Sequence, residues 1–340
     1  MKGKIRFLGL VMVLVLFVAV FLVSALSWAQ KKPPQPPANP AIVFTAEKGW
    51  GHTNLIVMDE DGSNQKVILN GVSGAGFGNH NPQWSLDGNR IAFGRNAGSD
   101  PIPSSISLIN KDGTGLCTVA FMRNTPDISF GYPQWSQDGL RLMYSDSPSS
   151  PQGHILQVVD AVCGANPSVD VIHPYHDLIF MLSWSPDGTK LAAQLADQGS
   201  GTDTIYTFVV FDVTHNPDGT WQAIPRINLT SSGPLKNADI WGADWTSDSS
   251  RLAIAARIPN VDTYDIWVIN LGDPFNPTNI TRTPGIPEIQ PSWSPLDDKI
   301  VYVRSDYFIY KMNADGFNPV RLASSAKNMV LREPDWRRNL

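Results

Sequence analysis

Cysteine and positive charge are both scarce in this 340-residue chain. It contains two cysteines, Cys117 and Cys163, and no Cys-x-x-Cys pair or Cys/His group with zinc-binding spacing, which excludes a structural zinc site of the common types. Acidic residues outnumber Lys and Arg by 31 to 26, and the formal net charge is −5. Because phosphate binding needs a concentrated basic surface, which this sequence lacks, nucleic acid is not expected as a partner.

Motifs for metal binding and nucleophilic catalysis are also missing. The pair His173 and His176 is interrupted by a proline and has no acidic ligand at a fixed spacing, and the turns at 59–62 and 313–316 lack the glutamate of a calcium loop. Segment 71–75 departs from the Gly-x-Ser-x-Gly elbow of serine hydrolases. We therefore expect no metal, no cofactor and no serine peptidase activity.

The dominant positive feature of the chain is a repeat. The stretch Trp-Ser-Pro-Asp-Gly-Thr-Lys-Leu-Ala-Ala begins at Trp184 and returns in four related copies. In every copy a basic residue lies six positions after the tryptophan and an aliphatic residue follows it. The copies begin at Trp84, Trp135, Trp184, Trp245 and Trp293. Their period of about 50 residues is typical of propeller blades.

Each copy predicts a β-hairpin. Residues Ser185 to Gly188 fit a type I turn, in which serine accepts local hydrogen bonds, proline presets φ and glycine takes the positive-φ position. The strand after the turn is short and apolar on both faces, as in residues 300–303, which is typical of a strand covered on both sides. A third strand and a short fourth strand follow, and four strands per repeat make a propeller blade.

The two ends of the chain share one repeat. Residues 41–46 match the strand that follows the turn, but no Trp hairpin precedes them, whereas residues 332–336 match the strand that precedes the turn. We predict that the C-terminal strand completes the first blade and closes the ring, so that five hairpins and this composite make six blades.

Cys117 and Cys163 fall in different repeats. Although they could pair in an oxidising compartment, we expect two separate buried side chains.

These motifs carry a family resemblance. The pattern Pro-x-Trp-Ser-Pro-Asp-Gly-x-Lys-Leu, followed by Ile-Tyr-x-Met-Asn-x-Asp-Gly and Leu-Thr, resembles the WD40-like repeat of TolB-type six-bladed β-propellers across residues 41–336. The resemblance implies an all-β fold of four-stranded antiparallel blades, and a blade type found in exported scaffolds, peptidase accessory domains and some lyases. TolB itself has an α/β domain before its propeller, whereas here a spacer leads directly into the first blade.

The N-terminal residues 1–29 predict export. Three basic residues precede an apolar run from Phe7 to Val23, and Ser27 and Ala29 form the small-x-small pattern of a signal peptidase site. The apolar run also approaches the ~20 residues that span a bilayer. The segment is therefore either a cleaved signal peptide or a retained signal anchor.

The rest of the chain divides into a linker and one domain. Residues 30–40 are rich in proline and form an extended linker, because proline can support neither a helix nor a paired strand there. Residues 41–340 form the propeller. We expect an exported, periplasmic or extracellular protein, tethered to the membrane through residues 7–29 if cleavage does not occur.

The candidate binding residues lie on the long connections opposite the Asp-Gly turns. Long loops on a rigid scaffold are where binding residues gather, and a ring of aromatic side chains around a channel mouth suits a peptide or carbohydrate. The candidates are Trp50, His80, Tyr132, Phe180, Trp241, Tyr264 and Glu333.

From these features we predict an exported, monomeric and non-catalytic propeller that binds a protein, a polysaccharide or another polymer on its long-loop face. One alternative is a propeller enzyme, a lyase or hydrolase with its site in the central channel. A His, an Arg and a carboxylate within ~4 Å of one another at the channel mouth would favour that alternative. The other alternative is the ectodomain of a membrane-tethered sensor.

Overall fold

The described part of the protein is all-β. The computed structural model describes residues 42–49, 52–71, 77–97, 104–122, 131–146, 155–164, 166–174, 178–197, 205–326 and 329–338. These residues form 24 strands and one short 3-10 helix, Gly233–Leu235, and belong to the compact unit Asn39–Leu340. No helix in the described ranges is long and apolar enough to cross a membrane. The predicted export segment 1–29 and linker 30–40 lie outside the described residues.

Four of the sheets contain four strands each, in the orders that follow. The first consists of β24 (Met329–Trp336), β1 (Ile42–Lys48), β2 (Thr53–Met58) and β3 (Lys66–Leu69). The second consists of β4 (Phe77–Trp84), β5 (Arg90–Ala97), β6 (Ser105–Asn110) and β7 (Cys117–Phe121). The other two are β16 (Asp239–Trp245), β17 (Arg251–Arg257), β18 (Asp265–Asn270), β19 (Asp273–Asn279), and β20 (Glu288–Trp293), β21 (Lys299–Arg304), β22 (Phe308–Asn313), β23 (Val320–Ser324).

The fifth sheet has eight strands. Its order is β12 (Leu178–Trp184), β13 (Lys190–Asp197), β14 (Ile205–His215), β15 (Trp221–Asn228), β11 (Val169–Ile172), β10 (Ile155–Asp160), β9 (Arg141–Asp146) and β8 (Gln134–Trp135). The sequence predicted six separate blades. The eight-stranded sheet differs because β11 pairs in parallel with β15 over Val171 and Ile172, whereas the other pairs in it are antiparallel.

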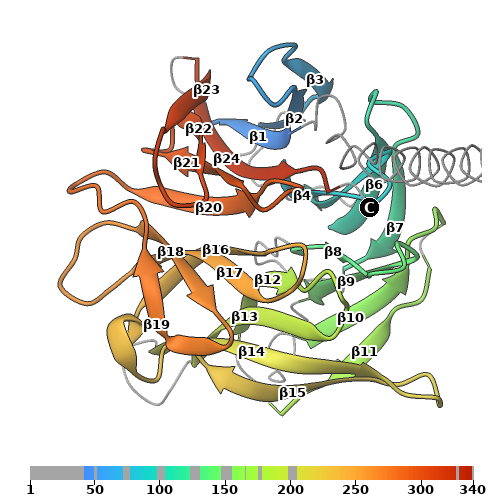
Figure 1. The fold of residues 1–340 in the computed structure, drawn as a ribbon. Coiled ribbons are helices and arrows are strands. Elements are labelled where there is room, and N and C mark those ends of the chain that lie inside the picture. The colour runs from blue at the N-terminus through green and yellow to red at the C-terminus, as the bar shows by residue number, and fades with distance from the viewer. Residues whose placement is uncertain are drawn as a thin grey trace, which may run out of the picture. The chain divides into compact units, whose positions relative to one another are not determined.

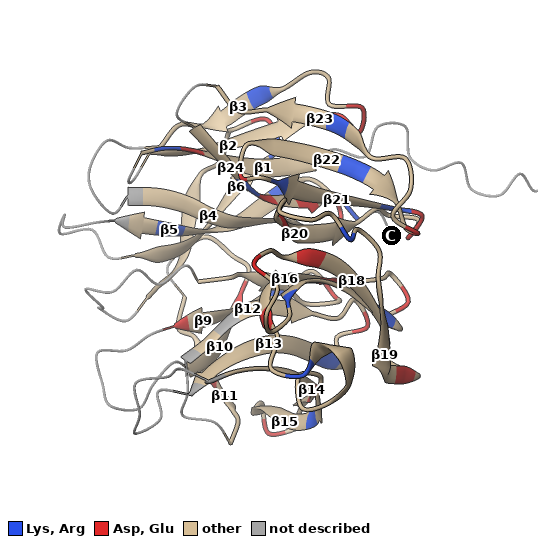
Figure 2. Cartoon of the chain, turned by 90° about the vertical axis from the view of Figure 1, so that its left-hand side faces the viewer, with Lys and Arg blue, Asp and Glu red and all other residues tan. Residues whose placement is uncertain are grey.

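The sheets are arranged around a ring, which confirms the predicted β-propeller (Figure 1). Strand β24 pairs with β1 from Ile42 opposite Trp336 to Lys48 opposite Met329. The last strand of the chain therefore completes the first sheet, as predicted, and leaves no open edge at that point. Acidic and basic residues are interspersed over the sheets (Figure 2).

The repeated turns explain why the hairpins form. In the turn after β12, the Ser185 hydroxyl donates to Asp187 at 2.6 Å and accepts the Lys190 N–H at 2.9 Å, while Gly188 has φ +73°. The same serine-to-aspartate bond occurs after β4 and β8. In the turn after β16, Ser249 takes the position that glycine has in the other turn and has φ +58°, so this turn keeps the same geometry without a glycine.

The repeated basic residue links neighbouring sheets. The Arg90 guanidinium lies 5.2 Å from the ring centroid of Trp135 in the next repeat, and Arg251 lies 5.0 Å from that of Trp293. These are cation–π contacts. Apolar clusters fill the space between adjacent sheets, as where Val43 and Leu55 of the first sheet pack with Ile91 of the second. The repeat period therefore arises from contacts between blades as well as from local turns.

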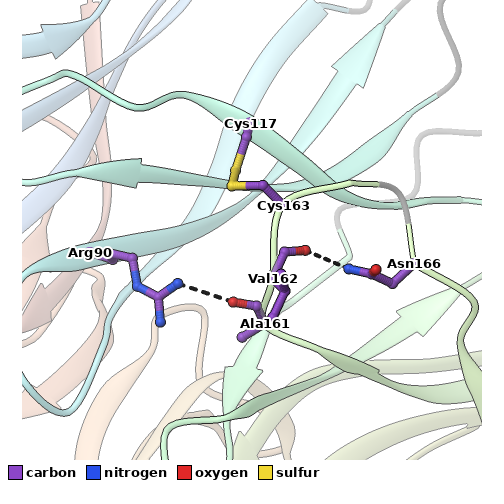
Figure 3. Close-up of a disulfide and its surroundings, with 6 residues drawn as sticks. All are labelled: Arg90, Cys117, Ala161, Val162, Cys163 and Asn166. Carbon is purple, nitrogen blue, oxygen red and sulfur yellow. Dashed lines mark hydrogen bonds between the residues drawn. A yellow bond between two sulfur atoms is a disulfide. The ribbon is translucent and has the colours of Figure 1, made fainter.

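A disulfide joins Cys117 to Cys163, and the prediction of two separate thiols is wrong. Cys117 begins β7, and Cys163 lies in the connection between β10 and β11 (Figure 3). That connection docks along β7, because the Gly164 N–H donates to the Thr118 carbonyl at 3.0 Å and the Asn166 N–H to that of Val119 at 2.7 Å. The sequence separation of 46 is close to one repeat, so the two positions meet across neighbouring blades.

Candidate functional site: an axial cavity and an aromatic cluster

Six strands approach the middle of the ring, and a left-handed residue lies three positions before the repeated tryptophan of each (Figure 1). Their φ angles run from 44° to 105°, and at five of the six positions the register with the neighbouring strand shifts. For a residue other than glycine this conformation costs about 1–2 kcal/mol. The residues are Asn81, Tyr132, Met181, Gly242, Gln290 and Glu333.

All six left-handed residues line one cavity of about 90 Å³. The residues that directly precede five of the tryptophans line it as well: Gln83, Gln134, Asp244, Ser292 and Asp335. A volume of this size accommodates a few water molecules. The repeated bulge therefore brings all six strands to one axial cavity, and five of them line it with polar side chains.

A chain of hydrogen bonds runs around this cavity. In five strands the backbone N–H of the repeated tryptophan donates a hydrogen bond to a side chain of a neighbouring strand, at 2.7–3.3 Å. The accepting side chain belongs to the residue directly before the repeated tryptophan of that strand. The bonds join Trp84 to Asp335, Trp135 to Gln83, Trp184 to Gln134, Trp293 to Asp244 and Trp336 to Ser292. Each accepting side chain thus belongs to one strand and is hydrogen-bonded to the backbone of another, which fixes the geometry of the cavity wall.

Three carboxyl groups face the cavity, and burial raises the pKa of each. Burial raises the pKa of Glu333 to about 7, although its carboxylate accepts the Asn81 N–H at 2.6 Å and the Thr45 hydroxyl at 3.2 Å. Burial, and then the charge of Asp244, raise the pKa of Asp335 to about 7. Burial also raises the pKa of Asp244, and the Arg338 guanidinium acts against that rise. The cavity is therefore acidic, and two of its three carboxyls, those of Glu333 and Asp335, have a pKa of about 7.

These raised pKa values predict a stability change with pH. A carboxyl whose pKa is higher in the folded protein contributes stability that is present below the unfolded pKa of about 4 and is lost as pH rises through about 7. We expect the unfolding free energy of Asp335→Asn, relative to that of wild type, to increase by roughly 2–4 kcal/mol when the pH rises from 4 to 8. Urea unfolding at a series of pH values measures this difference. Phe317→Ala, which truncates a 69% exposed turn residue and removes no titratable group, is the control, and its difference from wild type should stay constant. A pH-independent difference for Asp335→Asn would contradict the burial argument.

An aromatic cluster lies where β16 begins. The Trp241 and Tyr264 rings meet edge to face with centroids 5.6 Å apart, and the Arg332 guanidinium lies 5.2 Å from the Trp241 ring. The Tyr264 hydroxyl donates to Asp239, which also pairs with Arg257 at 2.8 Å. Burial, and then the bond to Asp239, raise the pKa of Tyr264, so this hydroxyl stays protonated. A half-buried indole thus lies between a cation and a phenol.

A second carboxylate–arginine pair lies at the start of β20. Arg304 Nε is 3.5 Å from Glu288 Oε1, which also accepts the Thr283 hydroxyl at 3.0 Å. Burial raises the pKa of Glu288. Within the described ranges, no group of three or more His, Cys, Asp or Glu residues could hold a metal ion.

The structure distributes the predicted binding residues over several places. Trp241 and Tyr264 are in direct contact, and Glu333 lies in the cavity one residue after Arg332. Tyr132 is partly buried, lines the same cavity and packs against the core. His80 lies on β4, where burial lowers its pKa to about 4. Trp50 lies outside the described residues, as does the side chain of Phe180.

Sequence reasoning missed most of the charged groups of this region. Asp244 and Asp335 each directly precede a repeated tryptophan, so an alignment of the repeats on tryptophan would have revealed them as polar residues at one position. Asp239, Arg257 and Arg332 occupy no fixed repeat position, and no sequence signal identified them.

Comparison with known proteins gives structural similarity only. No protein-family model matches the sequence, and no curated protein matches it either. Hydrazine synthase from Kuenenia stuttgartiensis superposes with a TM-score of 0.65 at 14% identity, over 87% of this chain and 46% of that one. This chain therefore spans less than half of the hydrazine synthase chain.

Two further structures are similar. A chain of the nidogen/laminin complex superposes with a TM-score of 0.55 at 11% identity, over 87% of this chain and 98% of that one. An oligogalacturonate lyase from Vibrio parahaemolyticus has a TM-score of 0.49 at 15% identity, over 85% and 74%. At these identities the similarity to hydrazine synthase and to the nidogen/laminin chain concerns the fold alone.

Proposed function

We propose that this protein is an exported, non-catalytic, six-bladed propeller of the TolB type that binds a protein or another polymer on the face where its inner strands begin. The observation that carries the proposal is Trp241, held between the Arg332 guanidinium and the Tyr264 ring. Trp, Tyr and Arg are the residues that most often dominate binding energy at interfaces. A half-buried indole in a rigid setting offers binding area at low cost in conformational entropy.

The six-blade reading divides the eight-stranded sheet into two blades. Strands β8 to β11 and strands β12 to β15 are each consecutive antiparallel sets, and among the described residues the only strand pairing between the sets is the short parallel one of β11 with β15. Each set also has one strand that reaches the axial cavity through a left-handed residue, as each of the other four sheets does. The repeated Trp-Ser-x-Asp-Gly turns support the assignment to the TolB type.

Two observations support export. The N-terminal residues 1–29 have the basic and apolar pattern of a signal segment. The Cys117–Cys163 disulfide requires an oxidising compartment to persist. If the signal segment is retained as an anchor, the same propeller is the ectodomain of a tethered sensor, and binding on the Trp241 face remains its function.

Further groups around Trp241 suit a polar polymer. Arg332 pairs with Asp306 at 2.6 Å, and the next residue, Tyr307, is 51% exposed. Asp239 also accepts the Gln194 amide at 3.1 Å, which extends the polar network to β13. An apolar anchor with a surrounding polar network matches the common anatomy of binding sites.

Replacement of the central indole tests the proposal. We expect Trp241→Ala to weaken binding by about 2 kcal/mol or more, roughly 30-fold, because the variant removes the anchor and uncovers Arg332. The wild-type unit 39–340, immobilised as bait, recovers a partner from envelope extracts or a polysaccharide library, and biolayer interferometry then measures the affinity of each variant for it.

The matched control is Phe317→Ala, which truncates a 69% exposed aromatic in the Asp-Gly turn that follows β22. Phe317→Ala should bind as the wild type does, and thermal unfolding should show both variants folded. If Phe317→Ala weakened binding and Trp241→Ala did not, the binding face would be the opposite one.

A second candidate is a propeller enzyme with its site in the axial cavity. Glu333 favours it, because a carboxyl in a water-sized cavity with a pKa of about 7 suits general acid or base chemistry. The enzyme reading predicts that the wild type cleaves the recovered polymer, as detected by mass spectrometry, and that Glu333→Gln abolishes cleavage but retains binding. Unchanged polymer after incubation with the wild type would favour the binding protein.

A further inference from the structure

The channel has a second end, where the Trp-Ser-x-Asp-Gly turns lie. A separate cavity of about 30 Å³ opens there, and Gln83, Asp244 and Asp335 line both it and the larger axial cavity. The two cavities are therefore successive parts of one channel that meet at these three polar side chains. Trp84, Trp135, Trp184 and Trp336 also line the smaller cavity, so aromatic rings and carboxylates surround it together.

The C-terminal residues after β24 occupy this end of the channel. Arg338 Nη2 donates to Asp244 Oδ1 and, at 2.7 Å, to the Trp245 carbonyl. In that ion pair the side chains of Arg338 and Asp244 are 23% and 10% exposed. Arg337 lies across a neighbouring turn, because a Cβ added at Gly88 would come within 2.3 Å of its Cδ. The Arg338 guanidinium therefore lies in the channel, whereas the Arg337 side chain lies against the turn at Gly88 beside it.

The groups around Arg338 form a recognition site for a guanidinium. A carboxylate and a carbonyl accept its N–H groups, which strengthens each bond by charge. A guanidinium presents its N–H groups in a fixed planar fork and is more weakly hydrated than a compact ammonium, so it suits two acceptors held in fixed positions. Asp244 is buried, and its ionised form needs a cation nearby. These contacts make the site selective for arginine over lysine.

We propose that the turn-face end of the channel is an arginine-binding site which the chain's own Arg338 fills, and which accepts the arginine of a partner segment when the tail is displaced. Only Arg337 separates Arg338 from the end of β24, so the tail holds its guanidinium at a high effective concentration. The tail therefore acts as an intramolecular competitor. This site is independent of the proposed binding face around Trp241.

Chemical rescue tests the site in the full chain. We expect Arg338→Ala to lower the melting temperature, and millimolar N-propylguanidinium to raise it again in a saturable way, because the added cation fills the vacated position. Wild type should not respond at these concentrations, because its site is filled. By calorimetry, N-acetyl-argininamide should bind Arg338→Ala at least ~10-fold more tightly than wild type, since the tail no longer competes.

Three comparisons make the test specific. Arg337→Ala removes an equal charge from the rim and should show no rescue. N-propylammonium should rescue Arg338→Ala less than N-propylguanidinium does. Adding Asp244→Asn to Arg338→Ala should abolish the response. If Arg338→Ala does not fold, Arg338→Met, which keeps an unbranched side chain but removes the guanidinium, serves for the same titration.

Equal responses of Arg338→Ala, Arg337→Ala and wild type to N-propylguanidinium would overturn the proposal. So would equal rescue by the ammonium and the guanidinium, because the site would then be a general cation site. Loss of binding at the Trp241 face affects neither result, so failure of the proposed function and failure of this inference are distinguishable.

Discussion

Removal of residues 332–340 is expected to abolish cooperative unfolding of the whole propeller. This deletion takes away most of β24, leaves β1 without its β24 partners from Ile42 to Thr45 and breaks the bond from the Trp84 backbone N–H to Asp335 at 2.7 Å. Both neighbouring sheets then lose contacts, and an unpaired strand edge is exposed. Circular dichroism with thermal unfolding measures the effect. A truncated protein that melts at the wild-type temperature would contradict ring closure as the source of stability.

A single substitution isolates the packing part of this effect. Trp336 is 1% exposed, and we expect Trp336→Ala to cost about 3–5 kcal/mol of unfolding free energy. Phe317→Ala is the control, because Phe317 is 69% exposed and its truncation should change the unfolding free energy by less than about 0.5 kcal/mol. Urea unfolding at constant pH measures both variants.

Loss of the disulfide is expected to be the second largest effect. Cys117 and Cys163 are 46 residues apart, and opening a loop of this size increases the entropy of the unfolded chain by the equivalent of about 4 kcal/mol. We therefore expect the double variant Cys117→Ser, Cys163→Ser to unfold at a much lower urea concentration than the wild type under oxidising conditions.

Reduction supplies the matched control for the disulfide. With a reductant present the wild type should lose nearly all its advantage over the double serine variant, because the cross-link is then absent from both. The single variants Cys117→Ser and Cys163→Ser should behave alike. A wild type that kept its full advantage after complete reduction would show that the cysteines stabilise by packing and not by the cross-link.

The sequence by itself determined the blade and its closure, because both depend on local chemistry. Ser185, Asp187 and Gly188 form their turn through bonds within six residues, so the repeated letters are sufficient to predict the hairpin. The split repeat at residues 41–46 and 332–336 likewise predicted the pairing of β24 with β1, since a ring leaves the missing strand only one place.

The candidate site was predictable only in part. Trp241 and Tyr264 were candidates because they are aromatic and lie on long connections, and the structure brings their rings together. Arg332, which completes the cluster, is 91 positions from Trp241 in the sequence numbering. No local sequence pattern predicts the contact between Arg332 and Trp241, because that contact depends on which strands lie side by side in the ring.

The tertiary structure alone decided the disulfide, the parallel joining of β11 to β15 and the polar channel. Cys163 meets Cys117 because a connection docks on the neighbouring blade, and Arg338 meets Asp244 across 94 residues. The physical reason is the same in each case. Turn formation depends on the residues of one repeat, whereas these contacts depend on how adjacent blades pack, and the packing exists only when the ring has closed.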